Sequence, residues 1–258
     1  MVLTADFHTH TTFSHGKGSI LDSAMSAKEK GLKKIAITDH GYGHTVYGIS
    51  HKKVPLMKSL CEEASKISGV DVVLGVETNI LGISGKTDMK FSDMQYMEVY
   101  LAGIHKFITY ESLKEWYLLL TKNFIARKLT KPSESLIKRN TQIYINAIKN
   151  NPIDILAHPG YCVFINAEEV AKCCADYGTT FEIDARKVHL SDDEWAKVAK
   201  TGVNFVIDSD AHSPDKIGFV GDTLSLIERT GIPRDKILNI DGKIPEFTRF
   251  KEYKEKNL

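Results

Sequence analysis

Histidine, aspartate and glutamate stand at the ends of short apolar runs along this 258-residue sequence. Seven such runs are followed or closed by these residues: His8 and His10, Asp39 and His40, Glu77, His105, His158, Asp184, and Asp208, Asp210 and His212. With 33 acidic residues and 10 histidines in the chain, these types make up about one residue in six. The proportion of runs that end on one of these residue types, seven of seven, is far above that background frequency.

Each short motif is a weak indication by itself. His8 and His10 are two residues apart, so on a strand their side chains point the same way and can bind one metal ion. Paired strand histidines are nevertheless often structural, and a strand-end glutamate such as Glu77 is often only solvated. The chemical interpretation depends on all the motifs occurring together at equivalent places.

The apolar runs themselves have the length and composition of buried β-strands. We expect strands at Val2–His8, Lys34–Asp39, Asp71–Glu77, Val99–Ile104, Ile153–Ala157, Thr180–Asp184 and Val203–Asp208. Amphipathic helices are expected between them, at Ser19–Lys30, Val54–Ile67, Ala167–Tyr177, Ser191–Thr201 and Asp222–Thr230. Ser191 and Glu194 form a capping-box pattern, which favours a helix start. The alternation predicts a parallel sheet covered by helices, and seven units favour a barrel over an open sheet.

In a parallel α/β barrel the carboxyl ends of all strands face one rim, where active sites form. The motifs therefore predict one basin of imidazoles and carboxylates. Without cations the carboxylates in such a basin would repel one another, so the sequence predicts bound divalent metal ions. Nitrogen and oxygen ligands suit zinc, manganese or iron.

The set of motifs resembles that of the PHP (polymerase and histidinol phosphatase) superfamily, and in particular its small stand-alone phosphatase-like members. The matching segments are Asp6–Thr11, Ser14–Gly16, Thr38–Gly41, Gly75–Ile80, Ala157–Gly160 and Asp208–His212. The resemblance runs from residue 2 to about residue 240. It implies a distorted (βα)7 TIM-like barrel with up to three metal ions per chain.

Carried over residue by residue, the resemblance implies three groups of ligands. The first metal would be held by His8, His10, Glu77 and Asp210; the second by Glu77, His105 and His158; the third by His15, His40 and His212. It also implies hydrolysis of a small phosphorylated substrate by a hydroxide held between metals, whose pKa divalent ions lower to about 7 in favourable zinc sites. Asp39, Asp184 and Arg186 are the expected catalytic side chains, and Lys17 and Lys106 are further candidates for binding phosphate.

Residues 106–150 interrupt the strand–helix rhythm and predict a helical insertion within one barrel domain over residues 1–258. Two helices are expected, about Tyr110–Leu129 and Pro132–Asn150. Nine Lys or Arg and three Glu give this segment a charge of +6. It is either a solvated helix pair or a rim that attracts an anionic substrate. The charged tail from Lys243 is expected to be loosely ordered.

Other functions remain as alternatives. They are a histidinol-phosphate phosphatase, a phosphodiesterase or exonuclease of the same fold, an amidohydrolase, and a metal-binding module without activity. An amidohydrolase commonly needs a bridging lysine where this chain has Glu77. The formal net charge of +1 argues against nucleic acid as a partner.

No apolar run is long enough for a membrane span, and the start of the sequence has no secretory signal pattern. With four cysteines and no C-x-x-C pair, a reduced, cytoplasmic protein is expected. The sequence leaves the oligomeric state open.

Overall fold

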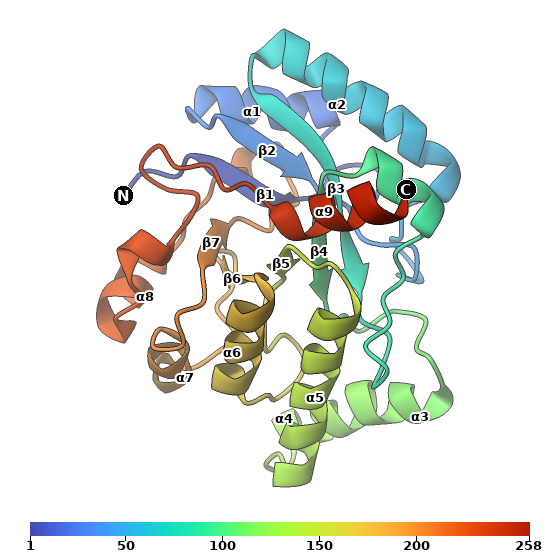
Figure 1. Cartoon of the computed structure of the whole chain (residues 1–258), viewed down its shortest axis with the longest axis vertical. Coiled ribbons are helices and arrows are strands. Elements are labelled where there is room, and N and C mark those ends of the chain that lie inside the picture. Colours follow the sequence, from blue (N-terminus) through green and yellow to red (C-terminus); the bar gives the residue numbers. More distant parts are fainter.

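Seven parallel strands form one sheet in the order in which they occur along the chain, as seen in a computed structural model that describes all of residues 1–258. They are β1 (Ala5–Thr9), β2 (Lys34–Ile37), β3 (Asp71–Asn79), β4 (Val99–Gly103), β5 (Ile155–Leu156), β6 (Thr180–Asp184) and β7 (Phe205–Asp208). The sheet curls until β1 meets the end of β7, where His10 N donates to Ala211 O at 2.8 Å. This nearly closed arrangement confirms the predicted distorted (βα)7 barrel (Figure 1).

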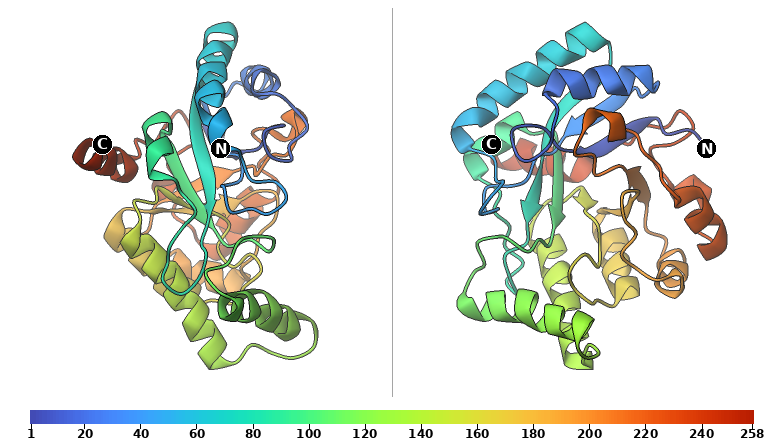
Figure 2. Two further views of the ribbon diagram at one scale, coloured as in Figure 1. Left: turned by 90° about the vertical axis from the view of Figure 1, so that its right-hand side faces the viewer. Right: turned by 180° about the vertical axis from the view of Figure 1, so that it is seen from behind.

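Helices surround the barrel in sequence order (Figures 1 and 2). They are α1 (Ile20–Glu29), α2 (Val54–Ser68), α3 (Leu113–Trp116), α4 (Lys122–Lys128), α5 (Glu134–Asn150), α6 (Ala167–Tyr177), α7 (Asp192–Val198), α8 (Thr223–Thr230) and α9 (Thr248–Asn257). The predicted capping box of Ser191 and Glu194 opens α7. No helix is both long and apolar enough to cross a membrane.

Two apolar layers hold these elements together. The larger lies between the strands and the helices and includes Ile35, Leu74 and Phe181, all fully buried. A small inner cluster with Phe7, Leu101 and Val206 fills the barrel itself. Residues that point inward alternate along the strands with residues that point toward the helices, as the two-residue period of a strand requires. The inner cluster makes the barrel a solid floor beneath the rim.

The predicted strands are correct in place, with differences at their ends. The largest is at β5, where a five-residue strand was predicted and two residues have regular strand geometry. The backbone pairing is nevertheless longer, because Asp154 N donates to Tyr100 O and Ala157 N donates to Ala102 O. The chain therefore stays beside β4 up to the residue before His158.

The prediction of a loosely ordered tail is wrong. Residues 248–257 form α9, which crosses in front of the strands in Figure 1. Phe250 on this helix is fully buried and its ring packs edge-on against Tyr100 at 5.4 Å. The buried carboxylate of Asp154 accepts hydrogen bonds from the Phe250 and Tyr100 amides. Phe250 thus docks a largely polar helix, together with Tyr253, which packs against the core, and Arg249 and Lys254, which donate to backbone oxygens of distant segments.

The segment 106–150 is helical as predicted, but its first helix is shorter and irregular. It begins at Leu113 and is divided by a π-helical turn, Tyr117–Thr121, before α4 continues to Lys128. The second helix, α5, begins at Glu134 after the cap residue Ser133. In Figure 1, α3 and α4 lie apart from the other helices, near one end of α5.

Candidate metal centre and active site

Side chains from the carboxyl ends of the strands converge on one cavity of about 290 Å³. Its lining includes the predicted metal ligands His15, His40, Glu77, His105, His158, Asp210 and His212. His8 and His10 are fully buried and lie at its floor, in contact with Glu77 and Asp210. The structure therefore brings all nine predicted ligand residues together, as the barrel geometry requires.

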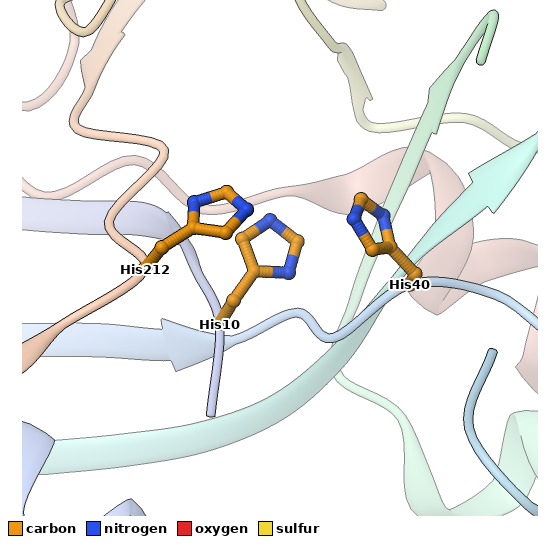
Figure 3. A group of neighbouring side chains, drawn as sticks. All are labelled: His10, His40 and His212. Carbon is orange, nitrogen blue, oxygen red and sulfur yellow. The ribbon is translucent and has the colours of Figure 1, made fainter. Parts of the chain in front are cut away.

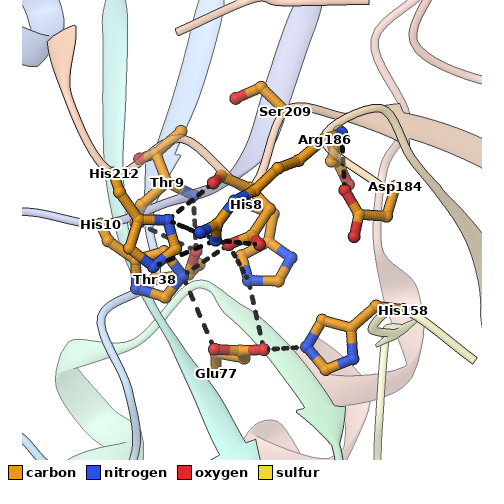
Figure 4. Close-up of polar contacts among 12 residues, drawn as sticks. His8, Thr9, His10, Thr38, Glu77, His158, Asp184, Arg186, Ser209 and His212 are labelled. Atoms are coloured by element: carbon orange, nitrogen blue, oxygen red, sulfur yellow. Dashed lines mark hydrogen bonds and ion pairs between the residues drawn. The ribbon is translucent and has the colours of Figure 1, made fainter. Parts of the chain in front are cut away.

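Glu77, near the carboxyl end of the long strand β3, points toward the histidines of the cluster (Figure 4). Its carboxylate is fully buried. Nitrogen atoms of five histidines lie within 3.6 Å of it: His8 at 3.2 Å, His10 at 3.6 Å, His40 at 2.6 Å, His105 at 2.9 Å and His158 at 2.5 Å. One carboxylate among five imidazoles could contribute an oxygen to more than one metal-binding group.

Asp210 is a second carboxylate on the opposite side of the histidines. Its Oδ1 lies 3.1 Å from His10 Nε2, 3.6 Å from His8 Nε2 and 3.5 Å from His212 Nδ1. The rings of His10, His40 and His212 turn toward a common space (Figure 3). Four overlapping groups could hold metal ions: His8–His10–Asp210, His8–Glu77–His158, His40–Glu77–His105 and His10–His40–His212.

His15 is the predicted ligand that fits least directly, since it belongs to none of these groups. It is nevertheless close to them. Its ring stacks on His40 at 4.8 Å between centroids and meets His212 edge-on at 4.1 Å. The 11–16 loop that carries His15 therefore places it above the cluster, at the cavity wall.

Several buried ligand atoms make no hydrogen bond of conventional geometry, although some lie close together, such as His40 Nδ1 and Glu77 Oε2 at 2.6 Å. His8 Nε2, both ring nitrogens of His10, His40 Nδ1 and Glu77 Oε2 are all buried without a conventional hydrogen bond. Buried polar groups normally form hydrogen bonds, so several buried polar atoms without one at the same place indicate that a ligand or ion binds there. A set of imidazole nitrogens and carboxylate oxygens within 4.8 Å of one another fits divalent metal ions.

The electrostatics favour the metal-binding protonation states of His10, His105 and Glu77. In His8 and His158 the attraction of the Glu77 and Glu182 carboxylates outweighs burial and raises the pKa, to about 9 for His158. Burial lowers the pKa of His10 well below its ordinary value, with His40 adding to the effect. Burial likewise lowers the pKa of His105 to about 4, against the attraction of Glu77. Burial alone would raise the pKa of Glu77, but His105, His8 and His40 hold it well below its ordinary value. A neutral imidazole and an ionised carboxylate are the ligand forms.

A second layer of contacts fixes the ligands. Glu182, at the middle of β6, accepts from His8 Nδ1 at 2.6 Å, and its other oxygen accepts the backbone amide of His158. His158 and Asp210 have positive φ angles of 40° and 43°, which cost free energy in residues with a Cβ. Gly103 leaves room for the His158 ring, because a Cβ there would lie 2.5 Å from His158 Cε1. The strained backbone of His158 and Asp210, and the close packing of the His158 ring against Gly103, therefore fix the directions of these two side chains.

The three predicted catalytic residues have different surroundings. Arg186 lines the cavity, and its Nη1 lies 2.8 Å from Asp210 Oδ2 and 3.0 Å from His212 Nδ1. Asp184 also lines the cavity, and its Oδ1 accepts the backbone amides of Arg186 and Lys187. Asp184 therefore shapes the turn from which Arg186 extends. Burial, with Glu182 and Asp210, raises the pKa of Asp184 to about 7.

Asp39 does not line the cavity. It is fully buried, and its oxygens accept from the backbone and hydroxyl of Thr11 and from the hydroxyl of Ser14. All of these contacts lie in the loop that carries His15. The structure thus gives Asp39 a positioning contact with that loop and no exposed face toward a substrate.

Sequence reasoning gave no role to several residues that the fold brings to the cavity. His44 stacks on His40 at 4.7 Å, and Tyr161 lies 5.3 Å from His158 and 5.0 Å from His189 between ring centroids. Lys187, which also had no assigned role, adds positive charge to the lining. Of the two lysines expected to bind phosphate, Lys106 lines the cavity and Lys17 does not. Two of the residues without an assigned role could have been predicted from their proximity to candidate site residues along the chain. His44 follows His40 closely, and Glu182 is two residues before Asp184 on the same strand.

The barrel and the histidine–carboxylate cluster define a protein of the metal-binding α/β barrel class. The profile of the PHP domain family matches residues 6–188, and the chain belongs to this family. It is 32% identical to a probable phosphatase of Thermoanaerobacter sp., over 98% of each chain. It is 30% identical to a probable phosphatase of Caldanaerobacter subterraneus, over 92% of this chain and 87% of the relative.

A solved structure has the same fold. The histidinol phosphate phosphatase of Lactococcus lactis, which was crystallised with zinc, L-histidinol and phosphate, is 14% identical to this chain. The likeness has a TM-score of 0.62 and covers 90% of this chain and 95% of the other. At this identity the likeness concerns the fold.

Proposed function

We propose that this protein is a metal-dependent phosphatase that hydrolyses small phosphomonoesters at a trinuclear site of zinc, manganese or iron. The observation that carries the proposal is the buried carboxylate of Glu77 among five imidazoles, on the floor of a cavity with a cationic rim. Membership of the PHP family and the names of the curated relatives support the phosphatase assignment.

Nine side chains would hold the ions. Glu77 would be shared between two of them, because its two oxygens face different histidines: Oε1 faces His105 and His158, and Oε2 faces His40. Asp210 would complete the group of His8 and His10. His40 belongs to two of the candidate groups, one with Glu77 and His105 and one with His10 and His212. With His212 and the neighbouring His15 it would hold the third ion.

When bound, the metal ions would supply the activation of water and the neutralisation of phosphate charge. The net reaction is addition of water: a water oxygen bonds to phosphorus, the bond from phosphorus to the ester oxygen breaks, and a proton reaches the alcohol that leaves. Arg186 would bind a phosphate oxygen at the rim, because a guanidinium suits the geometry of phosphate. Asp184 would position that arginine through its turn.

The size of the cavity supports a small substrate. About 290 Å³ is near the lower end of the range for small-molecule sites. It accommodates a phosphate and part of a leaving group. The lysines in the lining, Lys106 and Lys187, favour a doubly charged monoester.

The proposal is tested by metal analysis and a screen for phosphate release. We expect two to three divalent ions per chain and turnover of some phosphomonoesters. His8→Ala and Asp210→Ala should each lower kcat/KM by about a hundredfold or more, since each removes a ligand. His51→Ala is the control, a histidine outside the cavity that pairs with Asp93 at 2.6 Å. Less than one metal per chain after purification without chelator, or no phosphate release from any ester, would contradict the proposal.

Arg186→Ala is expected to lower kcat/KM by about ten- to a hundredfold, mainly through KM, because a charge-assisted hydrogen bond to phosphate is lost. Metal content should stay at the wild-type level, and Arg186→Lys should restore part of the activity. Arg234→Ala is a matched control, since Arg234 pairs with Asp241 at 2.8 Å outside the cavity. Wild-type KM values for Arg186→Ala would show that phosphate binds elsewhere on the rim.

A further inference from the structure

A second cavity, of about 420 Å³, lies next to the metal centre. Lys106 and Phe107 line both cavities, so the two are neighbours with one shared wall. Lys106 Nζ lies over the ring of Tyr161 at 5.6 Å, which places its charge beside the first cavity. A molecule held at the metal centre could therefore extend past these two side chains. We call this second cavity the insertion groove.

The apolar wall of the insertion groove comes mostly from the irregular helical segment after β4. Leu120 belongs to the π-helical turn, and Phe124 to α4. The side chains of Phe107 and Phe124 remain largely exposed, at 60% and 59% of their surface. Two exposed phenylalanines facing one cavity beside a cationic active site are a surface suited to an apolar group of a ligand.

The rest of the insertion groove is positively charged. Arg127 and Lys128 line it together with Lys106, and no acidic side chain does. Arg127 donates to Gly160 O at 3.4 Å and lies over the ring of Phe164 at 5.3 Å. It is thus held against the loop that carries His158. Three of the nine basic residues of the segment 106–150, Lys106, Arg127 and Lys128, therefore lie at this groove.

The π-helical turn is a further sign of function at this wall. A π-turn is less stable than the α-helix around it and occurs frequently at functional sites. Here it includes Leu120 and Thr121, which both line the insertion groove.

We propose that the insertion groove binds the leaving group of the substrate, and that this group has an apolar body with an anionic end such as a carboxylate. The proposal rests on the proposed phosphatase function and narrows its substrate class. The apolar body would lie against Phe107 and Phe124. The anionic end would face Arg127 and Lys128, because uncompensated cations favour an anion.

Three phosphate esters of primary alcohols test the proposal: propyl phosphate, phenylpropyl phosphate and carboxyphenylpropyl phosphate. Their leaving groups have similar chemistry, so differences in kcat/KM report binding of the added groups. With manganese-loaded protein we expect kcat/KM to rise in that order. Phe124→Ala should remove about a tenfold preference for the phenyl group. Lys128→Glu should remove about a tenfold preference for the carboxylate.

Two exposed residues of the same segment serve as matched controls. Leu129→Ala removes an apolar side chain that is 77% exposed and outside the groove, and Lys122→Ala removes a cation of α4 that does not line it. Neither should change the order of the three esters. Equal kcat/KM for all three esters in the wild type, or equal losses on all three in the groove variants, would overturn the proposal and leave the phosphatase function standing.

A thiol supplies a measurement that does not depend on turnover. Cys162 lines the insertion groove and is partly exposed, whereas the other three cysteines are buried. The product alcohol, carboxyphenylpropanol, should slow alkylation of Cys162 at mildly alkaline pH, and Lys128→Glu should weaken this protection. If no ester is hydrolysed but protection occurs, the phosphatase proposal fails and the groove remains a ligand site. If hydrolysis occurs without protection, the groove proposal is wrong.

Discussion

Glu77→Gln is expected to lose at least one metal ion and to lower kcat by about a thousandfold or more. The wild-type carboxylate lies within 3.6 Å of nitrogen atoms from five histidines and is fully buried. Glutamine keeps the shape but removes the negative charge that would lie between two cations in the proposed site, and these cations would then repel each other with less screening. It also places an NH₂ group, which cannot be a ligand, where an oxygen was.

The fold of Glu77→Gln should survive, because the inner apolar cluster and the helix layer are unchanged. Metal content, far-UV circular dichroism and turnover, measured on the same variant, test whether metal and activity are lost while the fold is kept. Glu98→Gln is the control: Glu98 precedes β4, pairs with Lys58 at 2.6 Å and lies outside the cavity. Normal metal content and near wild-type turnover in Glu77→Gln would show that Glu77 is not a metal ligand. The main observation behind the proposed metal site would then be lost.

Removal of the metals by a chelator should abolish turnover and lower Tm by about 10 °C. An ion present at a thousand times its Kd stabilises the folded state by about 4 kcal/mol, and 1 kcal/mol shifts Tm by about 2–4 °C in a protein of this size. The metal-free protein also keeps a cluster of buried ring nitrogens without partners. Manganese or zinc should restore both Tm and turnover.

Scanning calorimetry with and without chelator measures the shift, and phosphate release measures recovery. The His8→Ala variant supplies the comparison, because a protein that has already lost a ligand should respond less to chelator. An unchanged Tm together with full loss of turnover would mean that the ions bind weakly to a preformed pocket. Turnover that resists prolonged chelation and leaves no metal in the protein would contradict the metal-dependent mechanism.

The fold could be predicted because its signals are local. The apolar runs Lys34–Ile37 and Val99–Gly103 have no charged residue between their ends, as is typical of buried strands. Capping residues such as Ser191 begin helices through contacts three residues away. The tail was mistaken because its docking depends on contacts with residues far away in the sequence, such as those of Phe250 with Tyr100 and Asp154.

The candidate ligands could also be predicted, because parallel strands bring their carboxyl ends to one rim whatever their separation in the chain. The sequence therefore indicated that His8, Glu77 and Asp210 belong together. It did not indicate that Glu182 would orient His8 from 174 residues away, since nothing local couples the two. It likewise suggested Asp39 as catalytic, whereas the fold turns this carboxylate to Thr11 and Ser14.

By itself, then, the sequence determined the elements, their order and the donor atoms at the rim. The tertiary structure decided which oxygen of Glu77 faces which imidazole, how the strained backbones of His158 and Asp210 aim their side chains, and where Lys106 and Arg127 place their charges. The reason is physical: strand and helix formation depends on neighbours in the chain, whereas a site depends on the packing of seven loops. Only the closed barrel fixes their relative positions.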